Sequence, residues 1–144
     1  MKKIILFATF LLSNLAIFAQ NEADNILGVW ETEDKDGKIE IYKCGENYCG
    51  KLLEGSDIFE KDGITPKKDV KNPDPKLQSR DIPGITILTN LTFDGEEYED
   101  GKIYNAKNGK TYKCYIWLED GDLFLRGYLG LPILGQTTKW TRIK

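Results

Sequence analysis

Histidine is absent from the sequence, and its absence excludes several kinds of catalytic and metal site. A Ser-His-Asp triad, a Cys-His dyad and a histidine-liganded zinc site all need an imidazole group. The three cysteines are one ligand short of a four-cysteine metal site. We therefore expect no metal, no cofactor and no enzyme activity. A carboxylate-dependent hydrolase remains as an alternative, because carboxylates can act as acids and bases without histidine.

Basic residues are too few and too scattered to bind nucleic acid. The chain has 20 Lys and Arg against 23 Asp and Glu, a formal net charge of −3. Charges of both signs are interspersed, so the sequence offers no basic stripe for a phosphate backbone. We expect one globular domain, because a length of 144 residues leaves no room for two ordinary ones.

The N-terminus has the pattern of a secretory signal peptide. A short basic stretch is followed by the largely apolar run Ile4–Phe18 and then by Ala19. We expect residues 1–19 to be cleaved off after Ala19. Residues 20–144 would then be exported to the periplasm or beyond the cell as a monomer without membrane attachment. A retained membrane anchor is the alternative, because Ile17 is larger than the small residue usual two places before a cleavage site.

The cysteines fit an exported protein. Cys44 and Cys49 enclose four residues, which predicts a hairpin loop with the two thiols facing each other across the strands. In an oxidising compartment this pair forms a disulfide. Cys114 has the same strand parity as Ile116 and Leu118, so we expect it to be a buried, inert thiol.

The expected four-residue loop also sets a register for this hairpin. With Cys44 opposite Cys49, Ile41 lies opposite Leu52 on the inner face of the sheet. The disulfide then lies on the outer face.

The sequence predicts an all-β fold. Short runs rich in β-branched and aromatic residues alternate with turn clusters, and no segment shows a sustained helical period. Eight strands are expected, at residues 27–32, 38–43, 48–54, 85–93, 102–105, 111–118, 123–128 and 137–143. Closing such a meander removes its unpaired edges, so we expect an eight-stranded antiparallel up-and-down barrel.

Two segments interrupt this pattern of short links. Gly55–Gly84 carries four of the five prolines and no clear strand, and it is either a lid over the barrel mouth or a solvated surface loop. The apolar segment Leu129–Gly135 is either a short helical plug at the mouth or an exposed contact patch.

Candidate ligand-contacting side chains lie on the long loop and at the expected mouth. They are Asp69, Asn72, Arg80, Tyr104, Arg126 and Tyr128. Arg126 alternates with Phe124 and Tyr128, and a lumen position would require an acidic partner or an anionic ligand. An outward position is favoured, because Leu123 and Leu125 on the opposite face suit the core better.

The two ends of the predicted barrel resemble the lipocalin and wider calycin arrangement. Gly28-Val29-Trp30 opens the first strand, and Trp140-Thr141-Arg142 closes the last. In that arrangement a basic side chain from the last strand stacks on the first-strand tryptophan and seals the closed end. The resemblance implies that Gly28, Trp30, Trp140 and Arg142 are structural.

A set of motifs resembles the exported bacterial proteins of the domain of unknown function 2147 family (DUF2147). The motifs are Gly28-x-Trp30, Ile41-Tyr42-x-Cys44, Cys49-Gly50-Lys51, Asp69-x-x-Asn72-Pro73, Gly101-Lys102-Ile103-Tyr104, Gly109-Lys110-x-Tyr112, Arg126-Gly127-Tyr128-x-Gly130 and Trp140-Thr141-Arg142. The resemblance implies a lipocalin-like barrel and export. It brings no established activity or ligand.

The leading functional hypothesis is that the barrel binds a small apolar or amphipathic molecule. The alternative is a structural or interaction protein of the cell envelope whose interior is packed solid. Four aromatic side chains separate the two: a lumen filled by Phe93, Tyr104, Tyr115 and Trp117 would leave no cavity.

Overall fold

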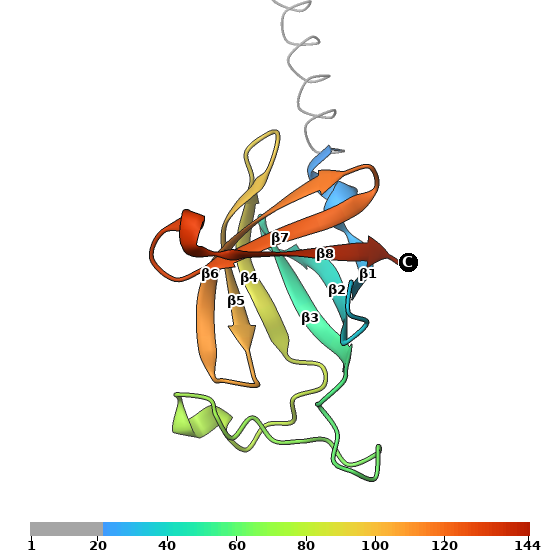
Figure 1. Ribbon diagram of the computed structural model, residues 1–144, viewed down its shortest axis with the longest axis vertical. Coiled ribbons are helices and arrows are strands. Elements are labelled where there is room, and N and C mark those ends of the chain that lie inside the picture. The colour runs from blue at the N-terminus through green and yellow to red at the C-terminus, as the bar shows by residue number, and fades with distance from the viewer. Residues whose placement is uncertain (1–21) are drawn as a thin grey trace, which may run out of the picture.

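The computed structural model describes residues 22–144, which form a closed eight-stranded antiparallel barrel (Figure 1). Each strand pairs with the next along the chain, and the last strand pairs back with the first. The predicted all-β up-and-down barrel is therefore confirmed. The expected signal peptide, residues 1–19, lies outside the described residues.

The elements are short. The strands are β1 (Gly28–Thr32), β2 (Gly37–Cys44), β3 (Asn47–Gly55), β4 (Thr86–Phe93), β5 (Tyr98–Asn105), β6 (Lys110–Glu119), β7 (Asp122–Tyr128) and β8 (Gln136–Arg142). Three 3-10 turns accompany them: η1 (Asp24–Ile26), η2 (Pro75–Leu77) and η3 (Pro132–Leu134). In the part of the chain from residue 22 onward, no helix is long and apolar enough to cross a membrane.

The core lies inside the barrel because apolar side chains alternate along the strands. Ile39 and Ile41 on β2 and Leu123 and Leu125 on β7 point inward and are buried, while their neighbours point outward. The buried thiol of Cys114 belongs to the same core, as predicted. Burial raises its pKa to about 12, which keeps it protonated and unreactive.

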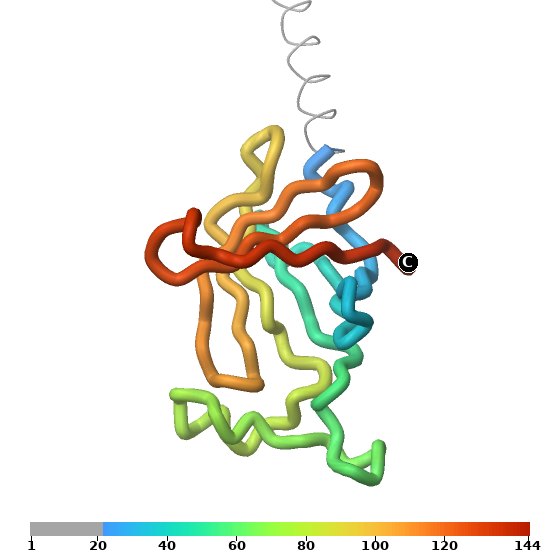
Figure 2. The backbone as a smooth tube through the Cα atoms, viewed as in Figure 1, coloured from blue at the N-terminus to red at the C-terminus, as the bar shows by residue number. Residues whose placement is uncertain are grey.

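The two ends of the barrel differ. Figure 2 shows η1 and the β4–β5 hairpin at one end and the long segment between β3 and β4 at the other. Ile26 of η1 is completely buried at the first end, so η1 plugs the barrel there. The other end is the mouth.

The strand β5 begins at Tyr98, four residues earlier than predicted. The turn before it is confined to Asp94–Glu97, where the Asp94 carboxylate accepts hydrogen bonds from the backbone N–H groups of Glu96 and Glu97 at 2.9 and 2.8 Å. Tyr98 is only 1% exposed, and burying its ring extends the strand.

The predicted disulfide between Cys44 and Cys49 is present, with a Cα–Cα distance of 5.9 Å. The predicted register was wrong by two residues, because the loop has two residues and not four. Cys44 pairs with Asn47, and Cys49 pairs with Tyr42. Gly45 has a φ of 67°, which this tight turn requires.

The corrected register keeps the disulfide on the outer face. Ile41 pairs with Gly50, and Leu52 pairs with Ile39 rather than with Ile41. Gly50 and the core residue Tyr48 point inward, so Cys49 between them along β3 points outward. The disulfide staples the strand ends without entering the lumen.

Removing this staple lowers stability moderately. We expect the double variant Cys44→Ser/Cys49→Ser to lose about 2 kcal/mol of unfolding free energy, because the unfolded chain regains the entropy of a short closed loop. Urea unfolding of the oxidised wild type and of the variant measures the difference. Adding a thiol reductant should shift the wild type toward the variant and leave the variant unchanged. Equal stabilities under oxidising conditions would contradict the expectation.

Candidate functional site

The closed end is sealed by Trp30 and Arg142. Trp30 is completely buried, and its indole Nε1–H donates to the Ile26 carbonyl at 2.9 Å. The Arg142 guanidinium lies 4.2 Å from the Trp30 ring centroid and donates through Nη1 to the Leu27 carbonyl at 2.6 Å. A side chain at Gly28, whose φ is 132°, would collide with the Arg142 guanidinium. The closure suggested by the resemblance is thus built around three of its four expected residues.

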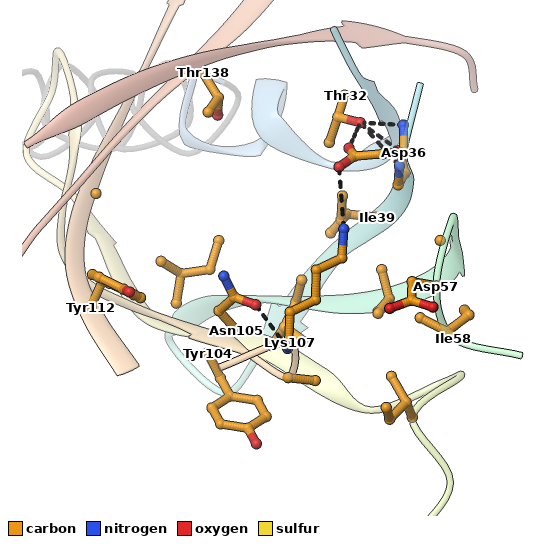
Figure 3. Close-up of a pocket in the computed structure, with 18 of the residues that line it drawn as sticks. Thr32, Asp36, Ile39, Asp57, Ile58, Tyr104, Asn105, Lys107, Tyr112 and Thr138 are labelled. Carbon is orange, nitrogen blue, oxygen red and sulfur yellow. Dashed lines mark hydrogen bonds and ion pairs between the residues drawn. The ribbon is translucent and has the colours of Figure 1, made fainter. Parts of the chain in front are cut away.

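A cavity of about 840 Å³ opens at the mouth of the barrel (Figure 3). Six strands supply its apolar wall, through Ile39, Leu52, Ile87, Ile103, Leu125 and Trp140. Trp140, expected at the closed end, therefore lies in the cavity wall. The volume is in the range of about 300–1,000 Å³ that small-molecule sites have in proteins.

Part of the cavity wall consists of apolar side chains that stay partly exposed. Leu52, Ile87 and Ile103 pack against the core yet stay only partly buried. In contrast, Leu88 and Leu123, which lie deeper in the barrel, have no exposed surface. The partial exposure of inward-facing apolar groups shows that the lumen is open at this end.

The four aromatic residues that could have filled the lumen leave the cavity open. Tyr115 and Trp117 alternate with buried core residues, so they lie on the outer face, where their rings stack at 5.7 Å. Phe93 packs on Tyr98 near the closed end, with ring centroids 4.8 Å apart. Tyr104 lies at the rim of the cavity. These four side chains therefore do not make the solid interior that the alternative hypothesis requires.

The long segment between β3 and β4 forms one side of the mouth. Ile58, Lys67, Lys71 and Ile82 of this segment line the cavity. Two isolated β-bridges, Phe59 with Pro66 and Lys68 with Asp81, stiffen it. The segment is thus an ordered wall at the opening and more than a solvated surface loop.

Four of the predicted ligand-contacting residues form one hydrogen-bonded network, here named the Asp69 latch. Asp69 Oδ2 accepts from Arg80 Nε at 3.0 Å, from Arg80 Nη2 at 2.9 Å and from Asn72 Nδ2 at 2.9 Å. Tyr104 donates its hydroxyl to Asp69 Oδ1 at 2.6 Å. Because Asp69 is completely buried, its charge depends on these partners. The latch joins the long segment to β5.

The latch holds Tyr104 in its neutral form. Burial, followed by the hydrogen bond to Asp69, raises the pKa of Tyr104 to about 12 from the usual 10. The backbone nearby is also tightly fitted, since a side chain at Gly109 would overlap the Lys71 carbonyl. The long segment is therefore fastened to the β5–β6 end of the barrel at two neighbouring places.

The structure gives the latch residues a role that the sequence did not suggest. Asp69, Asn72 and Arg80 do not line the cavity, whereas Tyr104 does. The reason is that the buried Asp69 carboxylate needs hydrogen-bond donors, and Asn72, Arg80 and Tyr104 supply them. Of these four residues, Tyr104 is the one whose position allows direct contact with a ligand in the cavity.

Arg126 points outward, as the alternation on β7 favoured. It donates to the Pro132 and Ile133 carbonyls at 2.8 and 3.2 Å and to Thr137 Oγ1 at 2.8 Å. Arg126 therefore holds η3 against the barrel and does not reach the lumen. Tyr128 lies at the cavity rim, with its ring 6.5 Å from that of Tyr115 on the outer face.

The segment Leu129–Gly135 forms a short turn with exposed apolar side chains and is not a plug. It contains the short turn η3, and Leu134 lines the cavity. However, Leu131, Ile133 and Leu134 are 64%, 80% and 76% exposed, so the segment does not plug the opening. It adds an apolar lip to the mouth.

Some residues of the site were not predicted. Ile87 and Leu88 both contribute to the barrel interior, because β4 shifts register against β3 between Thr86 and Leu88. Simple alternation on the strand does not show this irregularity. Lys71 and Lys107 line the opening but resemble other exposed lysines in the sequence. No local signal distinguishes them.

The comparisons with known proteins agree with this geometry. Residues 28–142 match the family described as an uncharacterized protein conserved in bacteria, DUF2147. The chain belongs to this family. The match spans all eight strands, so the DUF2147 barrel comprises both the closed end and the mouth. Among the curated proteins, none matches the sequence.

One solved structure similar to this DUF2147 chain is protein HP1028 from the human pathogen Helicobacter pylori, described as belonging to the lipocalin family. The two chains are 27% identical, each is covered over 83% of its length, and the TM-score is 0.72. This similarity supports a lipocalin-like barrel for the DUF2147 chain.

Proposed function

We propose that this DUF2147 protein is an exported, monomeric binding protein that holds a small apolar or amphipathic molecule in the barrel cavity. The observation that carries the proposal is the cavity of about 840 Å³ with an apolar wall from six strands. Covering that wall with a ligand removes apolar surface from water, which favours binding. The lipocalin-like fold is compatible with this use.

Two further features support export. The disulfide Cys44–Cys49 is of a kind that persists in oxidising compartments and is rare in the cytosol. The N-terminal sequence has the signal-peptide pattern, with cleavage expected after Ala19.

The closed barrel, in which every strand edge of residues 22–144 is paired, favours a monomer.

The proposal includes no catalysis. The sequence offers no histidine for acid–base work at neutral pH. The two carboxylates at the cavity rim already have partners: Asp36 accepts a hydrogen bond from Thr32 Oγ1 at 2.7 Å, and Asp57 forms an ion pair with Lys67. Both carboxylates are thereby committed to holding turns and loops in place.

Filling the cavity should abolish binding. We expect Ile103→Trp, which adds a large ring to the half-buried wall on β5, to weaken uptake of the neutral probe N-phenyl-1-naphthylamine at least about tenfold, or about 1.4 kcal/mol. Probe fluorescence measures binding, and thermal unfolding verifies the fold of the variant. Leu52→Trp makes the same test from β3 if the first variant unfolds.

The matched control is Ile143→Trp, which adds the same ring at a 45% exposed position outside the cavity. This variant should bind the probe as the wild type does. No probe uptake by the wild type, or unchanged uptake by folded Ile103→Trp and Leu52→Trp variants, would overturn the proposed function. If the wild type binds the probe, native mass spectrometry of protein purified from its own host would identify the natural ligand directly.

A further inference from the structure

The charged side chains at the cavity rim are mostly basic. They comprise four lysines and two aspartates: Lys67, Lys68, Lys71, Lys107, Asp36 and Asp57. This surplus contrasts with the formal net charge of −3 of the whole chain. Positive charge is therefore concentrated at the opening that leads to the apolar wall, and such a local field attracts anions.

Two of the lysines already have close carboxylate partners. Lys67 forms an ion pair with Asp57, and Lys68 Nζ lies 2.6 Å from Asp81 Oδ1. These contacts neutralise both ammonium groups where they stand. They leave the other two lysines as the source of the surplus charge.

Lys71 and Lys107 are paired more weakly. Lys107 Nζ lies 3.7 Å from Asp36 Oδ2, beyond hydrogen-bond distance, and Asp36 is also engaged by Thr32. Lys71 Nζ donates to the Lys107 carbonyl at 2.7 Å, and within residues 22–144 it makes no ion pair with a carboxylate. Both ammonium groups retain donors for an additional acceptor, since each carries three.

The two lysines lie where the polar head of an amphiphile bound in the cavity would lie. The Lys107 side chain extends from the β5–β6 turn toward Asp36 on the opposite side of the opening (Figure 3). The bond from Lys71 Nζ to the Lys107 carbonyl brings the second ammonium group to the same turn. Ile103 and Ile87 lie on the wall of the same cavity. A chain packed on this wall would therefore carry its head past both lysines.

We propose that Lys71 and Lys107 bind an anionic head, so that the ligand of the cavity is a single-chain amphiphile ending in a carboxylate or a phosphate. This assignment rests on the proposed binding function and specifies its ligand class. An ammonium group is a compact charge that accepts either head, whereas a planar guanidinium would favour a two-point contact. The apolar wall holds the chain, and the lysines select the charge of its end.

Displacement of N-phenyl-1-naphthylamine tests the assignment with four single-chain probes that have nearly the same alkyl tail and different heads. Dodecanoate and dodecyl phosphate carry anionic heads, dodecan-1-ol is neutral, and dodecyltrimethylammonium is cationic. We expect the wild type to bind at least one anion about five- to tenfold more tightly than the alcohol and the cation, since each of two exposed ion pairs adds a modest contribution. Whichever anion binds more tightly identifies the head.

The double variant Lys71→Gln/Lys107→Gln should lose this preference and bind the alcohol as before. The matched control is Lys102→Gln/Lys113→Gln, which removes the same charge from an exposed cross-strand pair outside the cavity. The control should keep the preference. Raising the ionic strength from about 0.01 to 1 M should also weaken the preference in the wild type, because the Debye length falls from about 30 to 3 Å.

The outcomes separate this assignment from the proposed function. If the wild type takes up the naphthylamine probe but binds all four heads equally, or if both double variants lose the preference alike, the lysine assignment is overturned and the binding function stands. If the wild type takes up neither the probe nor any amphiphile, the binding function itself fails.

Discussion

Trp30→Ala is expected to lower the free energy of unfolding by about 3–5 kcal/mol, the usual cost of removing a large buried aromatic ring. The ring is completely buried, in a core cluster that also contains Ile26 of η1 and Trp140 of β8. Removing the ring also leaves two polar groups without their partner. The Ile26 carbonyl loses the indole donor, and the Arg142 guanidinium loses the ring on which it stacks at 4.2 Å.

Denaturant unfolding measures the effect of Trp30→Ala, and the matched control is Trp117→Ala. Trp117 is the same residue type, but it lies on the outer face and stacks on Phe124 at 5.4 Å with part of its surface in water. Its loss should cost about 1 kcal/mol, mainly the ring pair. Equal losses for the two variants would contradict the assignment of Trp30 as the residue that closes the barrel.

Asp69→Asn is expected to destabilise the long segment by about 3 kcal/mol, because it turns one partner of a buried ionic network into a mismatch. The amide has the shape of the carboxylate but carries no charge to offset Arg80, and when its oxygen accepts from Arg80 and Asn72 its NH₂ group faces the Tyr104 hydroxyl, which donates to Asp69 in the wild type. Arg80 is 31% exposed and regains some hydration, which holds the effect at the lower end of the range for buried pairs. The latch then releases the segment from β5.

Hydrogen exchange measures this release. The amides of Asp69 and Ile82, which donate to the Arg80 and Lys67 carbonyls at 3.0 and 2.9 Å, should exchange faster in Asp69→Asn, while core amides of β6 and β7 change less. The control is Asp81→Asn, which removes an exposed ion pair and should cost well under about 1 kcal/mol. Unchanged exchange at both amides would show that the latch does not hold the segment.

The latch also has a defined dependence on pH. The pKa of Tyr104 is raised to about 12 in the folded protein, above its usual value of 10. A raised pKa means that the neutral phenol is favoured by folding, so its contribution is fully present below about pH 10. The contribution is lost as the pH rises through the folded value, where the phenolate would face the Asp69 carboxylate. At neutral pH the latch is closed.

The fold could be predicted because its signals are local. Alternation on β2 and β7 and the tight turns between strands place inward and outward side chains without knowledge of distant contacts. The outward direction of Arg126 followed from Leu123 and Leu125 alone. The register of the Cys44–Cys49 hairpin could not be derived in the same way, since two-residue and four-residue loops both bring the sulfurs within bonding distance. The pairing of Cys44 with Asn47 in the folded sheet decides between them.

The site was less accessible to prediction because it depends on partners far apart in the sequence. Asp69 and Tyr104 are 35 residues apart, and only the folded barrel brings the carboxylate under the phenol. The sequence did select both residues, but as ligand contacts. Lys71 and Lys107 were not selected, because their importance arises from the weakness of their pairing in the folded rim rather than from a motif.

The closure of the barrel by β8 has a consequence for folding. The hydrogen bond from Arg142 to Leu27 joins residues 115 apart, and the pairing of β1 with β8 involves similar separations. Such a distant pairing is slow to form, because the chain must close a long loop before these contacts contribute. Until β8 docks, β1 and β7 present open backbone edges to other chains. We expect a chain truncated before residue 136 to aggregate through these open edges, which light scattering would detect.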